Sequence, residues 1–137
     1  MSRPIPVPTE LSRPFWEGTR RGELLIPRCA ECGIRFFVPE PVCPACMSAR
    51  WSYEPSSGRG VVYAVTVVHR APGPGFDVPF ALAVIDLDDG GTLLSHVVDV
   101  EPGEVAIGTR VRAVFRPLDE SITLPCFVPL DEHGTQT

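Results

Sequence analysis

The sequence contains no lysine, and all twelve of its basic residues are arginine. Without lysine, no side chain can form a Schiff base with a substrate or act as an amine nucleophile. The formal net charge is −5, which disfavours general binding to nucleic acid, because that binding depends on positive charge facing the phosphates. Lysine-dependent catalysis is therefore excluded, and a nucleic-acid partner is not expected.

Long apolar runs are also missing. The longest uninterrupted run extends from Phe80 to Ile85, far short of the roughly 20 residues that a membrane-spanning helix needs. The first residues, Met1-Ser2-Arg3-Pro4-Ile5-Pro6, lack the hydrophobic region of a secretion signal. We therefore expect a soluble cytoplasmic protein without a membrane partner.

Proline and glycine, in contrast, are abundant. The 137 residues include sixteen prolines and twelve glycines, a composition that favours short strands and turns over long helices. Apolar residues make up 44% of the chain, which is enough to build a buried core. The length suits one compact domain, or one domain with a small appended module.

Four of the five cysteines form two C-x2-C pairs separated by ten residues: Cys29, Cys32, Cys43 and Cys46. In a chain without a secretion signal, this pattern indicates a metal site in preference to disulfides. Four thiolates match the tetrahedral coordination of Zn²⁺ and leave no open position for substrate. We predict one structural zinc ion per chain, with Cys126 as a buried residue outside the site. The spacing does not separate zinc from iron, so a rubredoxin-like electron carrier is an alternative.

The two cysteine turns differ at the residue that follows each second cysteine. Gly33 suits the positive φ that such a turn commonly needs, whereas Met47 stands at the equivalent place in the second turn. Either Met47 adopts the left-handed conformation at a cost of about 1 kcal/mol, or the second turn is distorted.

The chain divides into four expected parts: an arm and short helix (1–23), a zinc ribbon (24–53), a barrel (54–130) and a polar tail (131–137). The helix is predicted from Ser12 to Arg21, with Ser12 as its cap and Gly22 as its end. A helix this short is marginal alone, so we expect Phe15 and Trp16 to pack on another surface. That surface is either the protein's own body or a partner, which makes both aromatic residues partner-interface candidates.

Between the two cysteine turns, Arg35 to Val38 suits a small hairpin. The remainder predicts five strands, over residues 60–69, 80–87, 92–100, 110–116 and 123–128. The first is long enough to bend, and Asp88 to Gly91 is a hairpin turn. Five such strands fit a small closed Greek-key barrel of the OB type, with a short sandwich as the alternative. The expected fold class is mainly β.

A set of motifs in this order resembles a known family: Phe15-Trp16-Glu17-Gly18, Arg28-Cys29, Cys32-Gly33, Cys43-Pro44, Gly58-Arg59-Gly60, Thr66-Val67-Val68-His69-Arg70 and Ile107-Gly108. The chain is similar over residues 12–130 to small acyl-CoA-associated proteins that join a rubredoxin-like zinc ribbon to an OB-fold, a domain long catalogued as of unknown function. The resemblance implies a non-catalytic subunit that binds a thiolase-like or hydratase-like acyl-CoA enzyme. Such a subunit stabilises its partner or helps to position the CoA thioester.

The residues agree with a non-catalytic role. Ser95 and His96 are neighbours on a strand and point to opposite faces, and Cys126 has no histidine near it in sequence. We therefore predict no catalytic residue.

If acyl-CoA itself contacts this chain, its phosphates would be bound by arginine forks or by a histidine. The candidates are the polar residues that flank or line the first and fourth barrel strands: Arg59, His69, Arg70, Arg110 and Arg112. A charged strand face is also commonly just solvated. The rival interpretation for an OB barrel, binding of single-stranded nucleic acid, is opposed by the acidic charge.

Overall fold

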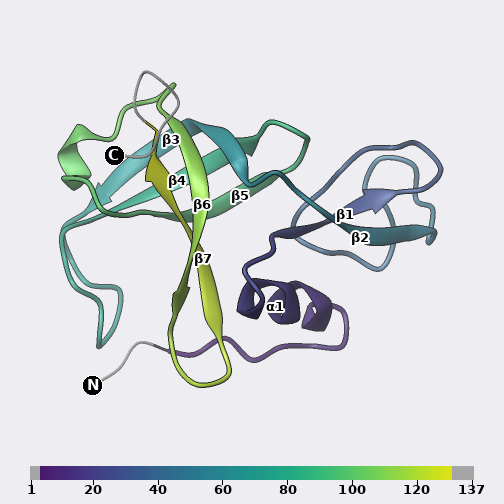
Figure 1. The fold of residues 1–137 in the computed structure, drawn as a ribbon, viewed down its shortest axis with the longest axis horizontal. Coiled ribbons are helices and arrows are strands. Elements are labelled where there is room, and N and C mark those ends of the chain that lie inside the picture. The colour runs from purple at the N-terminus through teal and green to yellow at the C-terminus, as the bar shows by residue number, and fades with distance from the viewer. Residues whose placement is uncertain (1–3, 131–137) are drawn as a thin grey trace.

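The computed structural model describes residues 4–130, so the predicted polar tail (131–137) lies outside the described residues. The chain is mainly β, as predicted, with one α-helix and one short 3₁₀-helix (Figure 1). The elements in order are α1 (Arg13–Arg20), β1 (Leu25–Cys29), β2 (Trp51–Pro55), β3 (Arg59–Val68), β4 (Phe80–Leu87), β5 (Thr92–Val97), η1 (Pro102–Glu104), β6 (Arg110–Pro117) and β7 (Thr123–Pro129). Within the described residues, no helix is long and apolar enough to cross a membrane.

The last five strands form a closed barrel in the order β3-β4-β5-β7-β6. All neighbours are antiparallel except β5 and β7, which pair in parallel at Val97 and Phe127. Strand β3 has an irregularity between Val62 and Ala64, and pairs with β4 along most of its length but with β6 only at its start. The predicted long, bent first strand and the OB-type barrel are therefore confirmed, and a sandwich is excluded.

Two glycines, Gly58 and Gly60, allow the start of β3 to lie close to the neighbouring strands β4 and β6. A Cβ atom on Gly60 would lie 2.5 Å from the carbonyl oxygen of Asp86, a distance that no side chain tolerates. Gly58 has φ +75°, and a Cβ there would lie 3.2 Å from the Cβ of Ala113. Gly60 therefore allows β4 to approach on one side of Arg59, and Gly58 supplies the positive φ that brings the chain beside Ala113 of β6.

The zinc ribbon is a separate two-stranded sheet, in which Leu25 to Cys29 of β1 pairs antiparallel with Trp51 to Pro55 of β2. The hairpin expected over Arg35–Val38 does not form: only Arg35 bridges to Arg28 of β1. The two intervening aromatic residues serve different cores. Phe36 packs on Trp51 at a centroid distance of 5.6 Å, whereas Phe37 packs on Phe15 at 4.9 Å. Because these two neighbouring side chains pack into different cores, the segment does not form a regular strand.

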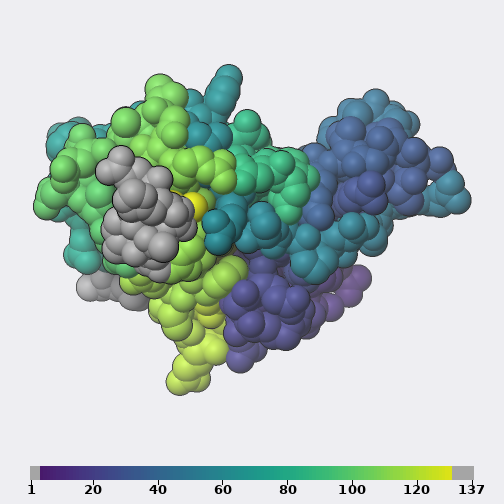
Figure 2. Space-filling model, turned by 45° about the horizontal axis from the view of Figure 1, so that its top comes forward, coloured from purple at the N-terminus to yellow at the C-terminus, as the bar shows by residue number. Residues whose placement is uncertain are grey.

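Helix α1 lies between the ribbon and the barrel and contacts β1, β6 and β7 (Figures 1 and 2). Its predicted cap, Ser12, makes no side-chain bond to the helix. Instead Thr9 and Ser12 exchange bonds one turn earlier: the Thr9 N–H donates to Ser12 Oγ at 2.9 Å, and the Ser12 N–H donates to Thr9 Oγ1 at 3.1 Å. The helix ends as predicted at Gly22, which has φ +79°, while the Glu23 N–H donates to the Gly18 carbonyl at 2.8 Å.

Candidate metal centre and partner-facing groove

The tertiary structure brings the four cysteines of the two turns together. Their sulfur atoms, from Cys29, Cys32, Cys43 and Cys46, all lie within 4.8 Å of one another. The sulfurs of Cys29 and Cys46 are 3.5 Å apart, and those of Cys32 and Cys43 are 3.6 Å apart. A tetrahedral site with Zn–S bonds of about 2.3 Å requires sulfur separations of about 3.8 Å. The donor set therefore fits one four-coordinate zinc ion.

The two turns have the same backbone geometry. The Gly33 N–H donates to the Cys29 carbonyl at 3.0 Å, and the Met47 N–H donates to the Cys43 carbonyl at 2.8 Å. Gly33 has φ +79° and Met47 has φ +68°. Of the two possibilities weighed for Met47, the structure has the left-handed residue and an undistorted turn. Its side chain is 71% exposed, so the backbone alone is constrained.

Backbone N–H groups point at the first sulfur of each turn. The Glu31 and Cys32 N–H groups face Cys29 Sγ at 3.4 and 3.5 Å, and the Ala45 N–H faces Cys43 Sγ at 3.4 Å. The hydrogen bond from the Cys32 backbone, with smaller help from neighbouring thiols, outweighs burial and lowers the pKa of Cys29 to about 7. Cys46 shifts the other way: a backbone hydrogen bond at Ser48 lowers its pKa, but the hydrogen bond that it shares with Cys29, together with burial, outweighs this and raises the pKa to about 12. Within this pair of thiols, Cys29 is therefore the one that ionises first.

The metal site has little apolar support around it. Its buried cluster consists of Cys29, Phe36 and Cys43, with Trp51 packed against them. The Trp51 indole N–H donates to the Pro41 carbonyl at 3.2 Å and so fixes the ring beside the site. A core this small folds stably only with its ion, so the zinc has a structural role.

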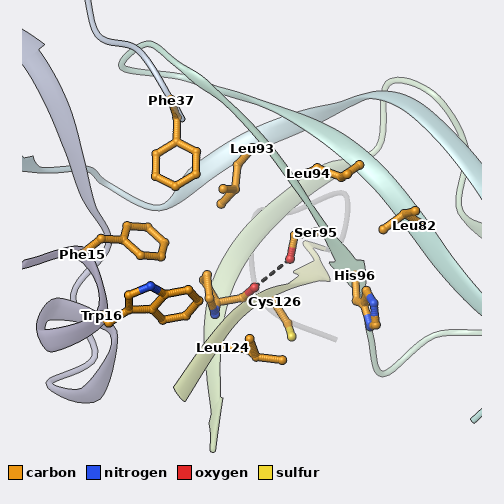
Figure 3. A pocket seen from close by; sticks show the side chains of 11 residues that line it. Phe15, Trp16, Phe37, Leu82, Leu93, Leu94, Ser95, His96, Leu124 and Cys126 are labelled. Carbon is orange, nitrogen blue, oxygen red and sulfur yellow. Dashed lines mark hydrogen bonds between the residues drawn. The ribbon is translucent and has the colours of Figure 1, made fainter. Parts of the chain in front are cut away.

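Phe15 and Trp16 have different surroundings. Phe15 is 3% exposed and lies in the protein's own core, whereas Trp16 is half-buried and packs edge-on against Phe15. Of the two predicted interface candidates, Trp16 is thus the one with surface left to offer a partner. Its ring lines a cavity of about 290 Å³ between α1 and strands β5 and β7 (Figure 3).

Exposed apolar side chains continue the surface beyond Trp16. Leu94 is 64% exposed and Val38 is 65% exposed, and both line a second hollow that shares Phe37 with the first. We call Trp16, Phe37, Val38 and Leu94 the apolar face. Leu94 was not among the residues predicted from the sequence, although the alternation of β5 provides a signal: Leu94 is a leucine at an outward position between buried residues.

The cavity also holds two residues that are distant in sequence, His96 and Cys126 (Figure 3). The sequence analysis set Cys126 aside because no histidine stands near it, but the barrel places both residues at one cavity. Cys126 is buried, as expected. Ser95, in contrast, is occupied: its hydroxyl donates to the Pro125 carbonyl at 2.7 Å across the seam between β5 and β7.

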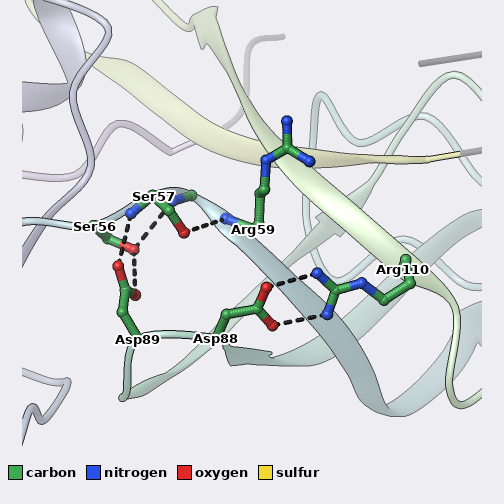
Figure 4. Close-up of polar contacts among 7 residues, drawn as sticks. Ser56, Ser57, Arg59, Asp88, Asp89 and Arg110 are labelled. Atoms are coloured by element: carbon green, nitrogen blue, oxygen red, sulfur yellow. Dashed lines mark hydrogen bonds and ion pairs between the residues drawn. The ribbon is translucent and has the colours of Figure 1, made fainter. Parts of the chain in front are cut away.

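The five phosphate candidates do not form one cluster. His69 and Arg70 follow the end of β3, ten residues and about 33 Å of extended strand from Arg59. The Arg110 guanidinium donates two hydrogen bonds, of 2.7 and 2.6 Å, to the two carboxylate oxygens of Asp88 and lowers the pKa of that carboxyl (Figure 4). Arg59 and Arg112 stand directly opposite each other on β3 and β6.

Two family models match consecutive parts of the chain. Residues 16–52 match the model described as "ChsH2, rubredoxin-like zinc ribbon domain", and residues 53–116 match "ChsH2, C-terminal OB-fold domain". A DUF35 domain-containing scaffold protein from Pyrococcus furiosus is 36% identical over 115 residues, which cover 82% of this chain and 83% of the relative. The chain belongs to the DUF35 family.

Other relatives are longer proteins, and this chain matches only a part of each. A probable enoyl-CoA hydratase alpha subunit from Thermomonospora curvata is 35% identical over 116 residues, covering 84% of this chain. The chain spans only about a third of that relative's length, 36%. Among solved structures, the "Ltp2-ChsH2(DUF35) aldolase" contains a chain with a TM-score of 0.83 and 32% identity, and the match covers 91% of this chain and 98% of that one.

The likeness to that DUF35 chain extends over ribbon and barrel together. DUF35 relatives carry the name scaffold protein, and others are subunits of hydratases or of an aldolase complex. The names of these relatives are thus those of scaffold proteins and of enzyme subunits, the class of protein that the sequence resemblance implied.

Proposed function

We propose that this chain is a non-catalytic subunit that binds a thiolase-like acyl-CoA enzyme in the cytoplasm, stabilises it and helps to position its CoA thioester. The observation that carries the proposal is the match to the DUF35 chain of a solved aldolase complex. The match covers 98% of that DUF35 chain. The fold, the ribbon and their order are shared along nearly the whole of both chains, which supports a shared way of working.

The apolar face supports the same role. A monomer that exposes apolar side chains side by side at the junction of ribbon, helix and barrel presents a surface typical of a protein interface. Trp16 is the natural anchor, because buried tryptophans contribute strongly to interfaces. On this proposal, α1 and the ribbon face the enzyme, and the barrel lies toward the entrance for CoA.

Co-expression with a thiolase-like acyl-CoA enzyme from the same organism tests the proposal. We expect the two proteins to purify together, and the enzyme to lose activity or solubility when expressed alone. The isolated chain should show no lyase, thiolase or hydratase turnover with acyl-CoA substrates. Turnover that persists through purification and disappears in Cys126→Ala, His96→Ala or His69→Ala would show that the chain is itself an enzyme.

A further inference from the structure

The start of β3 places two arginines directly opposite each other on adjacent strands. Arg59 and Arg112 are direct partners in the β3–β6 register, and their neighbours Gly60 and Val111 are buried. Because side chains alternate across a strand, Arg59 and Arg112 both point to the outer face of the barrel. Like charges directly opposite each other on adjacent strands repel and destabilise the sheet.

No carboxylate in residues 4–130 lies within ion-pair distance of either group, whereas six other arginines of that range have an acidic partner: Arg13, Arg21, Arg28, Arg50, Arg110 and Arg116. The Arg59 charge helps to lower the pKa of the Asp88 carboxyl, but less than Arg110, which binds both carboxylate oxygens. Figure 4 shows the Arg59 side chain pointing away from that pair.

Arg112 likewise forms no ion pair with a carboxylate of residues 4–130. Within the part of the chain that the structure describes, its side chain makes one hydrogen bond, from Nη1 to the Ala113 carbonyl, and this bond is long at 3.5 Å. It lines a hollow of about 390 Å³ together with Glu23, Ser57 and Gly58. Glu23 does not neutralise it, because Arg21 binds that carboxylate at 2.9 Å. Neither arginine of this pair therefore has a carboxylate of its own among the described residues, on a chain whose net charge is −5.

We propose that Arg59 and Arg112 form a binding site for a phosphate group with at most one ester bond, either free phosphate or the phosphate monoester group of a small molecule. A phosphate monoester carries a charge of about −1.5 to −2 at neutral pH and three acceptor oxygens, which matches two guanidinium forks. A carboxylate would leave one positive charge unbalanced. Binding would replace the repulsion between the strands with a shared counter-ion. Free phosphate and the 3′-phosphate of coenzyme A are the two sources, and the second rests on the proposed function.

The test uses the isolated, zinc-loaded chain at low salt, with NMR detection of the arginine side-chain N–H signals. Coenzyme A, dephospho-coenzyme A, adenosine 3′,5′-bisphosphate and inorganic phosphate are titrated separately. We expect the Arg59 and Arg112 signals to shift and saturate with coenzyme A and with the bisphosphate. Dephospho-coenzyme A, which lacks the monoester, should bind about tenfold more weakly, the scale of a charge-assisted hydrogen bond.

Three variants separate this site from general charge attraction. Arg59→Gln and Arg112→Gln should each weaken binding about tenfold, whereas Arg112→Lys, which keeps the charge but loses the fork, should weaken it less. Arg20→Gln removes one charge from an exposed arginine of α1 and should change nothing. Equal binding of inorganic phosphate would retain the site and assign it to free phosphate.

The proposal is wrong if none of the four ligands moves the two signals, or if Arg20→Gln weakens binding as much as the other variants. It is also wrong if Arg59→Gln and Arg112→Gln impair assembly with the enzyme and leave phosphate binding intact, since the pair would then face an acidic protein surface. Assembly is measured separately from ligand binding, so a failed anion site leaves the proposed function standing.

Discussion

The Tyr53 hydroxyl donates a hydrogen bond of 2.7 Å to the carbonyl oxygen of Leu11. Tyr53 belongs to ribbon strand β2, and Leu11 lies just before helix α1, so this bond joins two parts that are 42 residues apart. The Tyr53 ring also packs against Trp51 at a centroid distance of 5.3 Å, beside the metal site. The position of the helix is thereby coupled to the ribbon.

Tyr53 should titrate well above a free tyrosine, because burial raises its pKa to about 12. In a Tyr63→Phe variant, Tyr53 is the sole tyrosine, and its phenolate absorbance should appear near pH 12. The raised pKa stabilises the fold up to the unfolded value of about 10, and this contribution is lost as the pH rises from there through about 12. Phenolate absorbance that appears near pH 10 while the protein remains folded would contradict the burial of Tyr53.

Replacing Tyr53 with Phe removes the bond to Leu11 and leaves the ring. We expect a loss of about 1 kcal/mol in the free energy of unfolding, the usual contribution of one hydrogen bond. Hydrogen exchange should increase in α1 and remain unchanged in β4. Tyr63→Phe, at a tyrosine that is 68% exposed, is the matched control and should cost little.

Elemental analysis should find one zinc ion per chain. Cys32→Ala should release it, because a structural site rarely persists with three thiolates, and residues 24–53 should then loosen. The barrel has a core of its own and should retain its strand circular dichroism. Cys126→Ala, which lies outside the metal site, should keep full zinc content. Iron at full occupancy in protein from the native host would assign the site to electron transfer.

The left-handed Met47 offers a way to strengthen the second cysteine turn. Asn tolerates positive φ better than Met, so Met47→Asn should stabilise the metal-bound ribbon by about 0.5 to 1 kcal/mol. The matched control, Met47→Leu, keeps an apolar side chain at the same φ and should leave stability unchanged. Thermal unfolding of the two zinc-loaded variants measures the difference, and equal midpoints would show that the backbone at this position carries no strain.

The apolar face can be tested against an equally exposed apolar residue elsewhere. Trp16→Ala should weaken assembly with the enzyme by about 2 kcal/mol or more, and Leu94→Asp should also weaken it. Ile107→Asp changes a residue that is 72% exposed near η1, and assembly should survive it. Zinc content should be unchanged in all three variants. An intact Trp16→Ala complex at low concentration in size-exclusion chromatography would place the enzyme on another surface.

The features that depend on local spacing could be predicted from the order of the residues alone. Each C-x2-C turn brings its own two sulfurs within reach of one ion, so the spacing identifies the four ligands, while the ribbon fold brings the two turns together. Strand β4 begins at Phe80 and ends at Leu87, as predicted, because an apolar run bounded by Pro79 and the Asp88 to Gly91 turn leaves little choice. Gly22 likewise ends the helix through its own backbone freedom.

The tertiary structure decided which distant side chains meet, because barrel register is set by long-range packing that no local pattern encodes. It buried Phe15 against Phe37 and left Trp16 at the surface. The register also gave two arginines of β6 different neighbours. Arg110 binds Asp88, which lies in the turn between β4 and β5, whereas Arg112 lies opposite Arg59. Two arginine side chains on the same strand, Arg110 and Arg112, thus have different neighbours.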